Sequence, residues 1–171
     1  GTVSPGSLTT VFGTGLTSGS SVAAVTDHVR LGGTGVMLNG VPLPLLYASP
    51  GQVNFRLPNA LPEKPVLTVR AGVAASAPLP LQAVSATPGI FAITFDRDTL
   101  TLWATGLGEL DENRRTRLLP RVLHNGVEVD VLYSGQAPGF PGLYQVNVRQ
   151  SITAALSTRI RLEIGGVVAE I

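Results

Sequence analysis

The chain has 171 residues, a formal net charge of +1 and no cysteine. The small net charge excludes a long-range field that would select nucleic acid or an anionic membrane. The absence of cysteine excludes disulfides, thiolate metal sites and a cysteine nucleophile. Hydrophobic residues make up 44% of the chain and charged residues 13%, alongside 20 glycines and 13 prolines, a composition that favours short strands and tight turns over long charged helices.

In chain order, the first half predicts short strands separated by turn residues. Asn39-Gly40 stands between apolar runs, and this dipeptide is the strongest short-range signal for a type I′ hairpin, which needs positive φ at both central residues. The segment 22–30 fits either a strand or one short helical turn. The remaining pattern of alternation and turns predicts strands at residues 8–12, 36–38, 41–47, 52–57, 66–70 and 77–84.

The second half repeats the first. Three blocks, Asn-Gly-Val at 39–41, an apolar pair followed by Tyr at 45–47, and Gln-Val-Asn at 52–54, recur in the same order at 125–127, 131–133 and 145–147. The second copy carries an insertion before its last block. Because no amphipathic helix separates the strands, the repeat predicts an all-β fold of two tandem Ig-like β-sandwiches, residues 1–84 and 85–171.

The repeat also places large side chains at equivalent positions. Phe12 corresponds to Trp103, and Tyr47 corresponds to Tyr133. We interpret these matches as core packing and expect both tyrosines to be at least largely buried. The residues expected to be buried are Phe12, Leu46, Val53, Trp103, Leu132 and Val146.

No constellation of catalytic residues is evident, so we expect no enzyme activity. Asp27 precedes His28, but adjacent residues on a strand point to opposite faces, so Asp27 would not orient the imidazole. His124 stands immediately before a predicted turn. The sequence contains no nucleophile elbow, zinc-binding helix motif, P-loop or dinucleotide-binding glycine motif, and it predicts no cofactor.

Two charged clusters are candidate binding sites. Asp96 and Asp98 lie at the domain boundary and could contribute oxygen ligands to calcium, but Arg97 separates them and the EF-hand pattern is absent, so a solvated turn is favoured. The basic cluster is offset by neighbouring Glu109, Asp111 and Glu112 and has no interleaved aromatics, so we expect no nucleic-acid partner. Its members are Arg114, Arg115, Arg117 and Arg121.

The insertion of the second repeat includes a possible partner-binding loop, Pro138, Phe140 and Pro141, in the stretch 137–142. Proline and glycine on both sides stiffen this loop, so it could bind a partner at low entropic cost. The alternative is that Phe140 folds back and packs at the junction near residues 88–91. We favour packing, because a monomer seldom leaves a large apolar side chain prominent without a use.

The ordered motifs resemble the Solibacter-type uncharacterized C-terminal domain of large secreted bacterial proteins, whose halves are Ig-like folds of the IPT/TIG kind. The resemblance implies an extracellular or cell-surface location rather than an activity, and it raises the question of a missing segment between Phe91 and Thr101, where the family carries a longer stretch. The motifs that carry it are residues 4–8, 12–16, 39–42, 45–47, 52–54, 87–91, 104–108, 137–140 and 142–147.

These observations predict a non-catalytic structural or adhesive module, with other domains of a parent protein or cell-surface components as its partners. The alternative is a ligand- or glycan-binding module that uses loops at one end of a sandwich. No apolar run is long enough to span a membrane. The N-terminus lacks the basic and apolar regions of a signal peptide, so we expect the chain to be a fragment of a larger protein.

Overall fold

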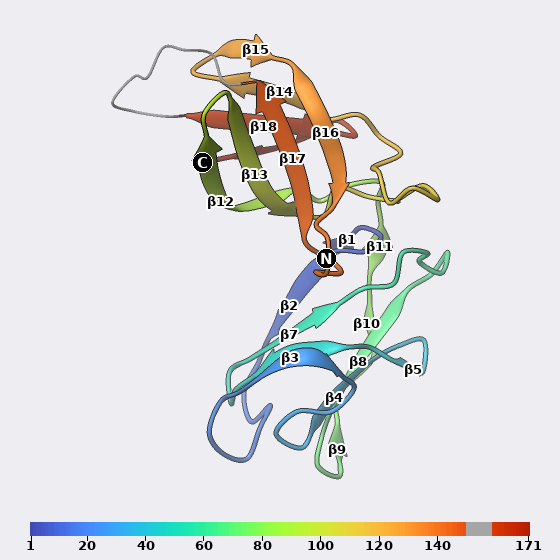
Figure 1. The fold of residues 1–171 in the computed structure, drawn as a ribbon. Helices are drawn as coiled ribbons and strands as arrows, with labels where there is room; N and C mark the ends of the chain where they lie inside the picture. The colour runs from blue at the N-terminus through green and yellow to red at the C-terminus, as the bar shows by residue number, and fades with distance from the viewer. Residues whose placement is uncertain (150–158) are drawn as a thin grey trace.

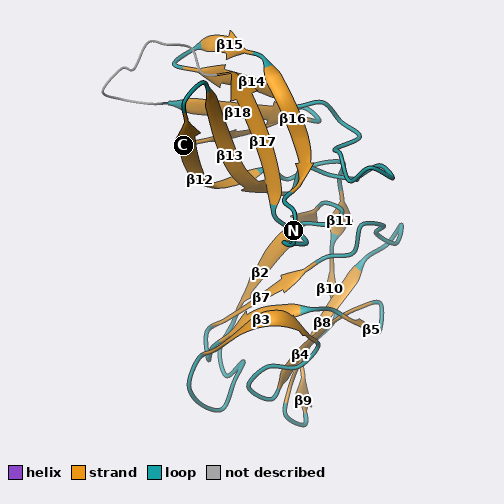
Figure 2. Cartoon of the chain, viewed as in Figure 1, coloured by secondary structure: helices purple, strands orange, loops and turns teal. Residues whose placement is uncertain are grey.

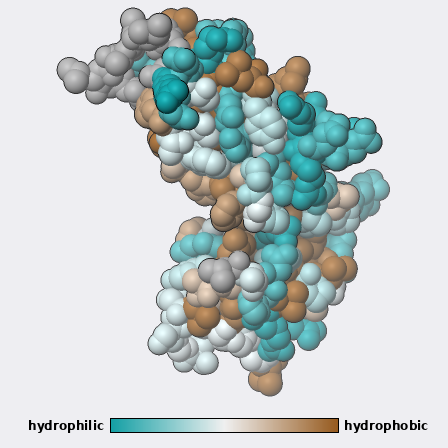
Figure 3. All heavy atoms as spheres, viewed as in Figure 1, coloured by the Kyte–Doolittle hydropathy of each residue, from teal (hydrophilic) through white to brown (hydrophobic). Residues whose placement is uncertain are grey.

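The computed structural model describes residues 1–149 and 159–171, and this part of the chain contains strands, turns and loops without a helix (Figure 2). The predicted all-β class is therefore confirmed. Two sandwiches are stacked along the long axis of the molecule, and they meet at a narrow waist beside the N-terminus (Figures 1 and 3). We call them domain one and domain two. No helix of the described residues is long and apolar enough to cross a membrane.

Domain one is built from two sheets that enclose one core. The first has the order β2-β7-β6-β3, and the second has the order β10-β8-β4-β5 with β9 added to β8. Val53 and Phe55 on β7 and Val36 on β4 are fully buried between them. The strands are β2 (Leu8–Phe12), β3 (Val22–His28), β4 (Thr34–Leu38), β5 (Val41–Pro42), β6 (Leu45–Ala48), β7 (Gln52–Arg56), β8 (Val66–Ala71), β9 (Ala74–Ala75) and β10 (Leu79–Pro80).

Domain two has the same two-sheet construction around a second core. Its sheets have the orders β12-β13-β17-β16 and β15-β14-β18-β19. Leu100, Leu102 and Val146 of the first sheet pack with Leu162 of the second, all fully buried. The strands are β12 (Gly89–Asp96), β13 (Thr99–Thr105), β14 (Arg121–His124), β15 (Val127–Val129), β16 (Val131–Gln136), β17 (Tyr144–Arg149), β18 (Ile160–Ile164) and β19 (Val167–Glu170).

The repeated Asn-Gly turns form equivalent hairpins. Asn39 and Gly40 have φ of 48° and 83°, and Asn125 and Gly126 have φ of 50° and 82°, as the predicted type I′ geometry requires. Each asparagine also bridges its hairpin to the next strand of the sheet, because Asn39 Oδ1 accepts from Val66 N at 2.6 Å and Asn125 Oδ1 accepts from Arg159 N at 2.9 Å. The hairpin prediction is confirmed.

The two sandwiches differ at their edges. In domain one β3 pairs with β6, whereas in domain two the loop after β13 occupies the corresponding position beside β16 through a bridge between Arg115 and Gly135. Domain two instead adds β12, which pairs with β13 up to Asp96 and Thr99. Residues 92–100 thus form a tight hairpin that links Phe91 to Thr101 directly.

The expected core residues are correct on the equivalent strands β7 and β17 and wrong on others. Val53 and Val146 are fully buried, but Phe12 is 75% exposed and Leu132 is 47% exposed. Trp103 is only half-buried, because β13 turns Leu100, Leu102 and Ala104 toward the core and the residues between them outward. Leu46, Tyr47 and Tyr133 are half-buried as well.

Candidate functional site

The two domains meet at a joint formed by the N-terminal segment, the linker at 84–88, and the ends of β13 and β17. The strand β1 (Thr2–Val3) runs parallel to β11 (Gln82–Ala83), which leads into the linker. Val84 N then donates to Val3 O at 2.9 Å. The first residues of the chain therefore hold the linker by backbone pairing as it leaves domain one.

A pair of hydroxyls carries the contact into domain two. The Oγ of Ser4, which is fully buried, lies 2.7 Å from Thr87 Oγ1, and it also lies within 3.4 Å of the carbonyl oxygen of Gly106, to which it can donate. Thr87 N donates to the same carbonyl at 2.8 Å. The N-terminal turn, the linker and the loop after β13 are thus bound to one another at one point.

Thr105, the last residue of β13, joins three segments with one hydroxyl. Its Oγ1 accepts from Leu8 N at 2.7 Å and donates to Gly142 O at 2.9 Å. Leu8 begins β2, and Gly142 belongs to the loop between β16 and β17. Because a hydroxyl supplies one donor and can accept as well, both capacities are used across the joint.

Tyr144 lies at the centre of the joint and is 1% exposed. Its hydroxyl lies 2.6 Å from the carbonyl oxygen of Gly108 and 3.4 Å from that of Pro5 in domain one, and it donates mainly to the nearer one. Burial raises the pKa of Tyr144 to about 12, because a phenolate would lose its hydration, while Arg114 acts in the opposite direction. The phenol is therefore neutral and a donor at physiological pH.

Glycine is required at three places in the joint by close approach as well as by conformation. Gly6, Gly106 and Gly142 have φ of 68°, 73° and 87°, a region that disfavours other residues. A Cβ on Gly142 would lie 2.6 Å from Leu8 Cδ2, and one on Gly106 would clash with the backbone carbonyl of Thr87. The glycines of the sequence motifs at 4–8, 104–108 and 142–147 thus allow the two domains to touch.

The joint is suited to holding the domains and not to acid–base chemistry. Its side-chain contacts come from the hydroxyls of Ser4, Thr87 and Thr105 and from the phenol of Tyr144. None of these groups changes its protonation near neutral pH. Within the described residues, every buried side-chain nitrogen or oxygen has a hydrogen-bond partner.

The histidines do not form a catalytic pair with a carboxylate. His28 Nε2 lies 3.1 Å from Thr26 Oγ1, while Asp27 pairs with Arg56 at 2.5 Å, as strand alternation predicts. His124 ends β14 and is 8% exposed. In residues 1–149 and 159–171, no three His, Cys, Asp or Glu side chains are grouped closely enough to hold a metal ion; Asp96 and Asp98 are exposed at the turn of the β12–β13 hairpin.

The basic cluster is dispersed over separate partners. Arg117 lies 3.6 Å from Glu109, and the guanidinium of Arg115 lies 5.0 Å from the ring centroid of Tyr133. Arg121 contacts Glu128 at 2.8 Å and Glu163 at 3.2 Å. The hydrogen bonds to these carboxylates raise the pKa of Arg121. The arrangement therefore consists of separate ion pairs and not a continuous basic patch.

The predicted partner-binding loop is exposed. Pro138, Phe140 and Pro141 all face solvent, and Phe140 is 63% exposed. The favoured expectation that Phe140 packs at the junction is wrong: its neighbour Gly142, and not the ring, fills the close approach to Leu8. The loop is nevertheless ordered by two turns, with Phe140 N donating to Ala137 O and Leu143 N donating to Phe140 O, each at 3.1 Å.

An apolar groove of about 540 Å³ lies in domain one between the Asn-Gly hairpin and the segment 57–62. Polar groups in its lining are limited mainly to Asn39 and Arg56, so the groove offers shape with little chemistry to orient a ligand. Its walls are formed largely by Val41, Pro42, Pro44, Pro58, Leu61 and Pro62.

Comparisons with known proteins assign the chain to no family. No family model matches the chain, and no curated protein matches it. A solved structure described as tandem Ig repeats of Dlar aligns over 99% of this chain and 88% of that chain, with 13% identity and a TM-score of 0.31. The tandem Ig-like fold rests on the two pairs of sheets described above. The resemblance to the Solibacter-type domain remains a prediction.

The role of the joint residues is not predicted from the sequence. In the sequence, Thr105 and Tyr144 are parts of motifs, and Ser4 is part of a turn. The contact between Tyr144 and Pro5 spans 139 positions of the sequence, so no local pattern announces it. The available signal was the set of glycines beside these residues, because a glycine outside a hairpin turn often marks close backbone approach.

Proposed function

We propose that the chain is a non-catalytic extracellular module that holds other parts of a larger secreted protein at a fixed separation. The observation that carries this proposal is the hydrogen-bonded joint, in which Ser4, Leu8 and Pro5 of domain one contact Thr87, Thr105 and Tyr144 of domain two. Flexible tandem domains are the default when interfaces are small. A spacer needs the opposite property, which the paired linker and buried hydroxyls supply.

The extracellular location and the parent protein are part of this proposal and rest on the family resemblance. Domain surfaces of the parent or of the cell exterior are the expected partners. Stiffness supports the role in physical terms, because a stiff spacer sets the distance between the groups it carries, whereas a flexible linker lets that distance fluctuate.

Distance measurements between spin labels test the spacer role. The chain has no cysteine, so the pair Val73→Cys and Val127→Cys places one label on an exposed hairpin tip of each domain. We expect a narrow distance distribution in the otherwise unchanged chain. The double substitution Ser4→Ala with Thr105→Val should broaden it, since the hydroxyl contacts that these two residues make across the joint are lost.

The matched control is Thr10→Val, which removes an exposed hydroxyl on the same strand that begins at the joint. Its distribution should stay as narrow as that of the parent pair. A broad distribution in the parent pair would refute the spacer proposal, because the joint would then not fix the domains.

A second proposal concerns the loop at 137–142, which we infer to be a contact for a neighbouring domain or surface protein. Phe140 is 63% exposed on a loop held by its own hydrogen bonds, so a partner would order little on binding. Phe140→Ala should change the free energy of unfolding by about 0.5 kcal/mol or less. A photo-crosslinking residue at position 140 should capture a partner on the surface of the source cells, and capture equal to that from exposed Val73 would refute the proposal.

A further inference from the structure

The outer faces of two equivalent sheets carry the same side chains at the same register. Face 1 lies on β2, β7 and β6 of domain one and consists of Thr10, Phe12, Tyr47, Gln52 and Asn54. Face 2 lies on β13, β17 and β16 of domain two and consists of Thr101, Trp103, Tyr133, Gln145 and Asn147. Four of these residues, Phe12, Tyr47, Trp103 and Tyr133, are repeated side chains for which the sequence predicts core packing.

Their pairing is identical in the two domains. In face 1, Thr10 stands opposite Asn54, Phe12 opposite Gln52, and Tyr47 opposite Asn54. In face 2 the same three pairs are made by the matching residues, Thr101 with Asn147, Trp103 with Gln145, and Tyr133 with Asn147. Cross-strand neighbours share one side of a sheet, so each face presents one large aromatic, one tyrosine and a polar row.

The polar rows are also bonded alike. Asn54 Oδ1 accepts from Thr10 Oγ1 at 3.1 Å and from Gln52 Nε2 at 2.7 Å. Asn147 Oδ1 accepts from Thr101 Oγ1 at 3.2 Å and from Gln145 Nε2 at 2.9 Å. These bonds fix the amide orientation, so that the asparagine NH₂ is turned away from the bonds as a donor and the glutamine Oε1 remains an acceptor.

Core packing does not account for this repetition. Both cores lie on the other side of these sheets, around Val53 in domain one and Val146 in domain two. Phe12 is 75% exposed, and Trp103 is half-buried with its Nε1 donating to Thr94 Oγ1 at 3.0 Å. Each face thus places an aromatic ring, exposed in face 1 and half-buried in face 2, beside pre-oriented amides, and aromatic residues of this kind are common in binding surfaces.

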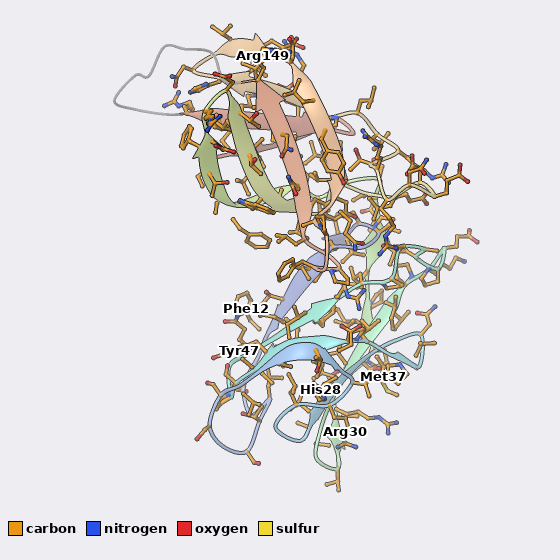
Figure 4. All side chains as sticks on the ribbon, viewed as in Figure 1. Phe12, His28, Arg30, Met37, Tyr47 and Arg149 are labelled. Carbon is orange, nitrogen blue, oxygen red and sulfur yellow. The ribbon has the colours of Figure 1, made fainter. Side chains whose placement is uncertain are left out.

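The charges on the faces are balanced. Neither set of five contains an ionised side chain. Each polar row continues to an arginine two residues further along its strand, Arg56 beside the joint in face 1 and Arg149 at the far end of face 2. Each arginine is paired with an aspartate, Asp27 at 2.5 Å and Asp130 at 3.5 Å. Arg149 lies at the end of domain two away from the joint, while Phe12 and Tyr47 lie on one side of domain one (Figure 4). Such a surface fits an uncharged ligand rich in hydrogen-bonding groups.

The two faces lie end to end along the molecule. Thr105 ends β13 and accepts a hydrogen bond from Leu8, which begins β2. At about 3.4 Å per strand residue, the distance along this line from Trp103 to Phe12 is roughly 25 Å. A single small sugar cannot reach both aromatic rings at this distance, but an extended polymer can contact both faces.

We propose that faces 1 and 2 together bind one chain of a neutral polysaccharide. Phe12 and Trp103 stack on the apolar C–H faces of sugar rings, and the amides of Gln52, Asn54, Gln145 and Asn147 bond to sugar hydroxyls. A polymer with repeating units is the ligand that matches a duplicated site, since binding at one face raises the effective concentration of the next units at the other. This site differs from the sandwich-end loops and does not depend on the spacer role.

Affinity electrophoresis of the whole chain tests the proposal. The gels contain mixed-linkage β-glucan, xylan, galactomannan, dextran or, as an acidic comparison, polygalacturonate. We expect at least one neutral polymer to retard the protein and polygalacturonate to have a smaller effect. Phe12→Ala and Trp103→Ala should each lower the affinity for that polymer about 100-fold. Each substitution leaves only one face able to bind, so the increase in affinity from simultaneous binding at two faces is lost.

A short oligosaccharide of the same polymer, titrated by calorimetry, separates the two faces. Either single variant should halve the number of oligosaccharide sites without changing the affinity of the remaining site. Phe95→Ala is the matched control, because Phe95 is 54% exposed but stands opposite buried Leu100, on the other side of the sheet from face 2. It should bind as the unaltered chain does.

Thermal unfolding establishes that each variant is folded, and Gln145→Ala replaces Trp103→Ala should the latter unfold. The proposal is overturned if none of the neutral polymers retards the chain, if only polygalacturonate does, or if the folded variants of both faces bind as tightly as the unaltered chain.

Discussion

Replacing Tyr144 by phenylalanine removes a single oxygen atom from the centre of the joint. The hydroxyl is buried and donates to the carbonyl of Gly108 at 2.6 Å. A lost hydrogen bond costs about 0.5–1.5 kcal/mol, and leaving the carbonyl unsatisfied in a buried place brings the penalty to about 1–3 kcal/mol. Tyr144→Phe is therefore expected to lower the free energy of unfolding by about 2 kcal/mol at neutral pH.

The difference between the two proteins should then change with alkaline pH. Burial raises the pKa of Tyr144 in the folded chain to about 12, above the usual tyrosine value of 10.0. The stability that the buried phenol confers is therefore fully present below pH 10 and is lost as the pH rises toward 12, because the unfolded chain releases the proton first. The difference between pKa 10 and pKa 12 corresponds to about 2.7 kcal/mol of free energy of unfolding. The unaltered chain should therefore lose its greater stability relative to Tyr144→Phe before pH 12.

Urea titrations at intervals from pH 7 to pH 12, followed by circular dichroism, measure this difference directly. Comparing the two proteins at each pH cancels the titration of all other groups. Tyr133→Phe is the control at neutral pH, because its hydroxyl donates to Gln136 O at 3.2 Å within domain two and the residue is only half-buried; its cost should be smaller. A difference between the unaltered chain and Tyr144→Phe that stays constant up to pH 12 would show that the phenol is not buried.

Three further substitutions or titrations examine the joint, the core and the outer charges. Gly106→Ala should destabilise domain two by more than Gly126→Ala does. A Cβ at 106 would clash with backbone atoms, whereas nothing lies within 4 Å of a Cβ at 126, where the positive φ alone costs about 1–2 kcal/mol. Equal melting temperatures for the two variants would contradict this. Leu102→Ala should cost about 2–5 kcal/mol in urea and Trp103→Ala less, since only Leu102 is fully buried; the reverse order would contradict the strand's orientation. The pKa of Glu163 is lowered, chiefly by the hydrogen bond that it accepts from Arg121. The contribution of this carboxylate to stability should therefore be present above its unfolded pKa and lost as the pH falls through its folded pKa. An NMR titration that gives an ordinary glutamate pKa would refute the pairing.

The fold was accessible from the sequence because its strongest signals are local. Asn39-Gly40 and Asn125-Gly126 fix two hairpins through φ alone, and the apolar alternation of Val53 and Phe55 fixes the inner side of β7. The recurrence of both signals in one order is sufficient to predict two similar sandwiches.

The side of each sheet on which a residue lies was less accessible. The recurrence of an aromatic residue at the equivalent positions of Phe12 and Trp103 indicates a common role in the two domains. It does not show whether that role is core packing or ligand binding. The run 8–12 has no clean alternation, so its orientation depends on pairing of Thr10 with Asn54, a register set by residues far along the chain. A one-residue change of register would have exchanged Phe12 and Val11 between solvent and core.

The joint was inaccessible for a related reason. Its contacts link Ser4 with Thr87 and Tyr144 with Pro5, and hydroxyls of serine, threonine and tyrosine are unremarkable in any β-rich sequence. Only the positions of glycine hinted at close approach. The loop at 137–142 shows the opposite error. Its residue type suggested that Phe140 packs at the junction, whereas Gly142, two residues later, makes the close approach to Leu8.

The joint holds the two faces relative to each other, and a final measurement tests whether this arrangement contributes to polymer binding. Avidity across a span of roughly 25 Å is greatest when the connection holds the two sites at the separation the ligand requires. Ser4→Ala with Thr105→Val alters no residue of either face, but it removes the hydroxyls that hold β13 against β2. We expect this double variant to keep the oligosaccharide affinity of the unaltered chain while its affinity for the polymer falls toward that of Phe12→Ala. Equal loss for the oligosaccharide and the polymer would mean that the joint acts by distorting a face, and an unchanged polymer affinity would mean that the two faces act independently.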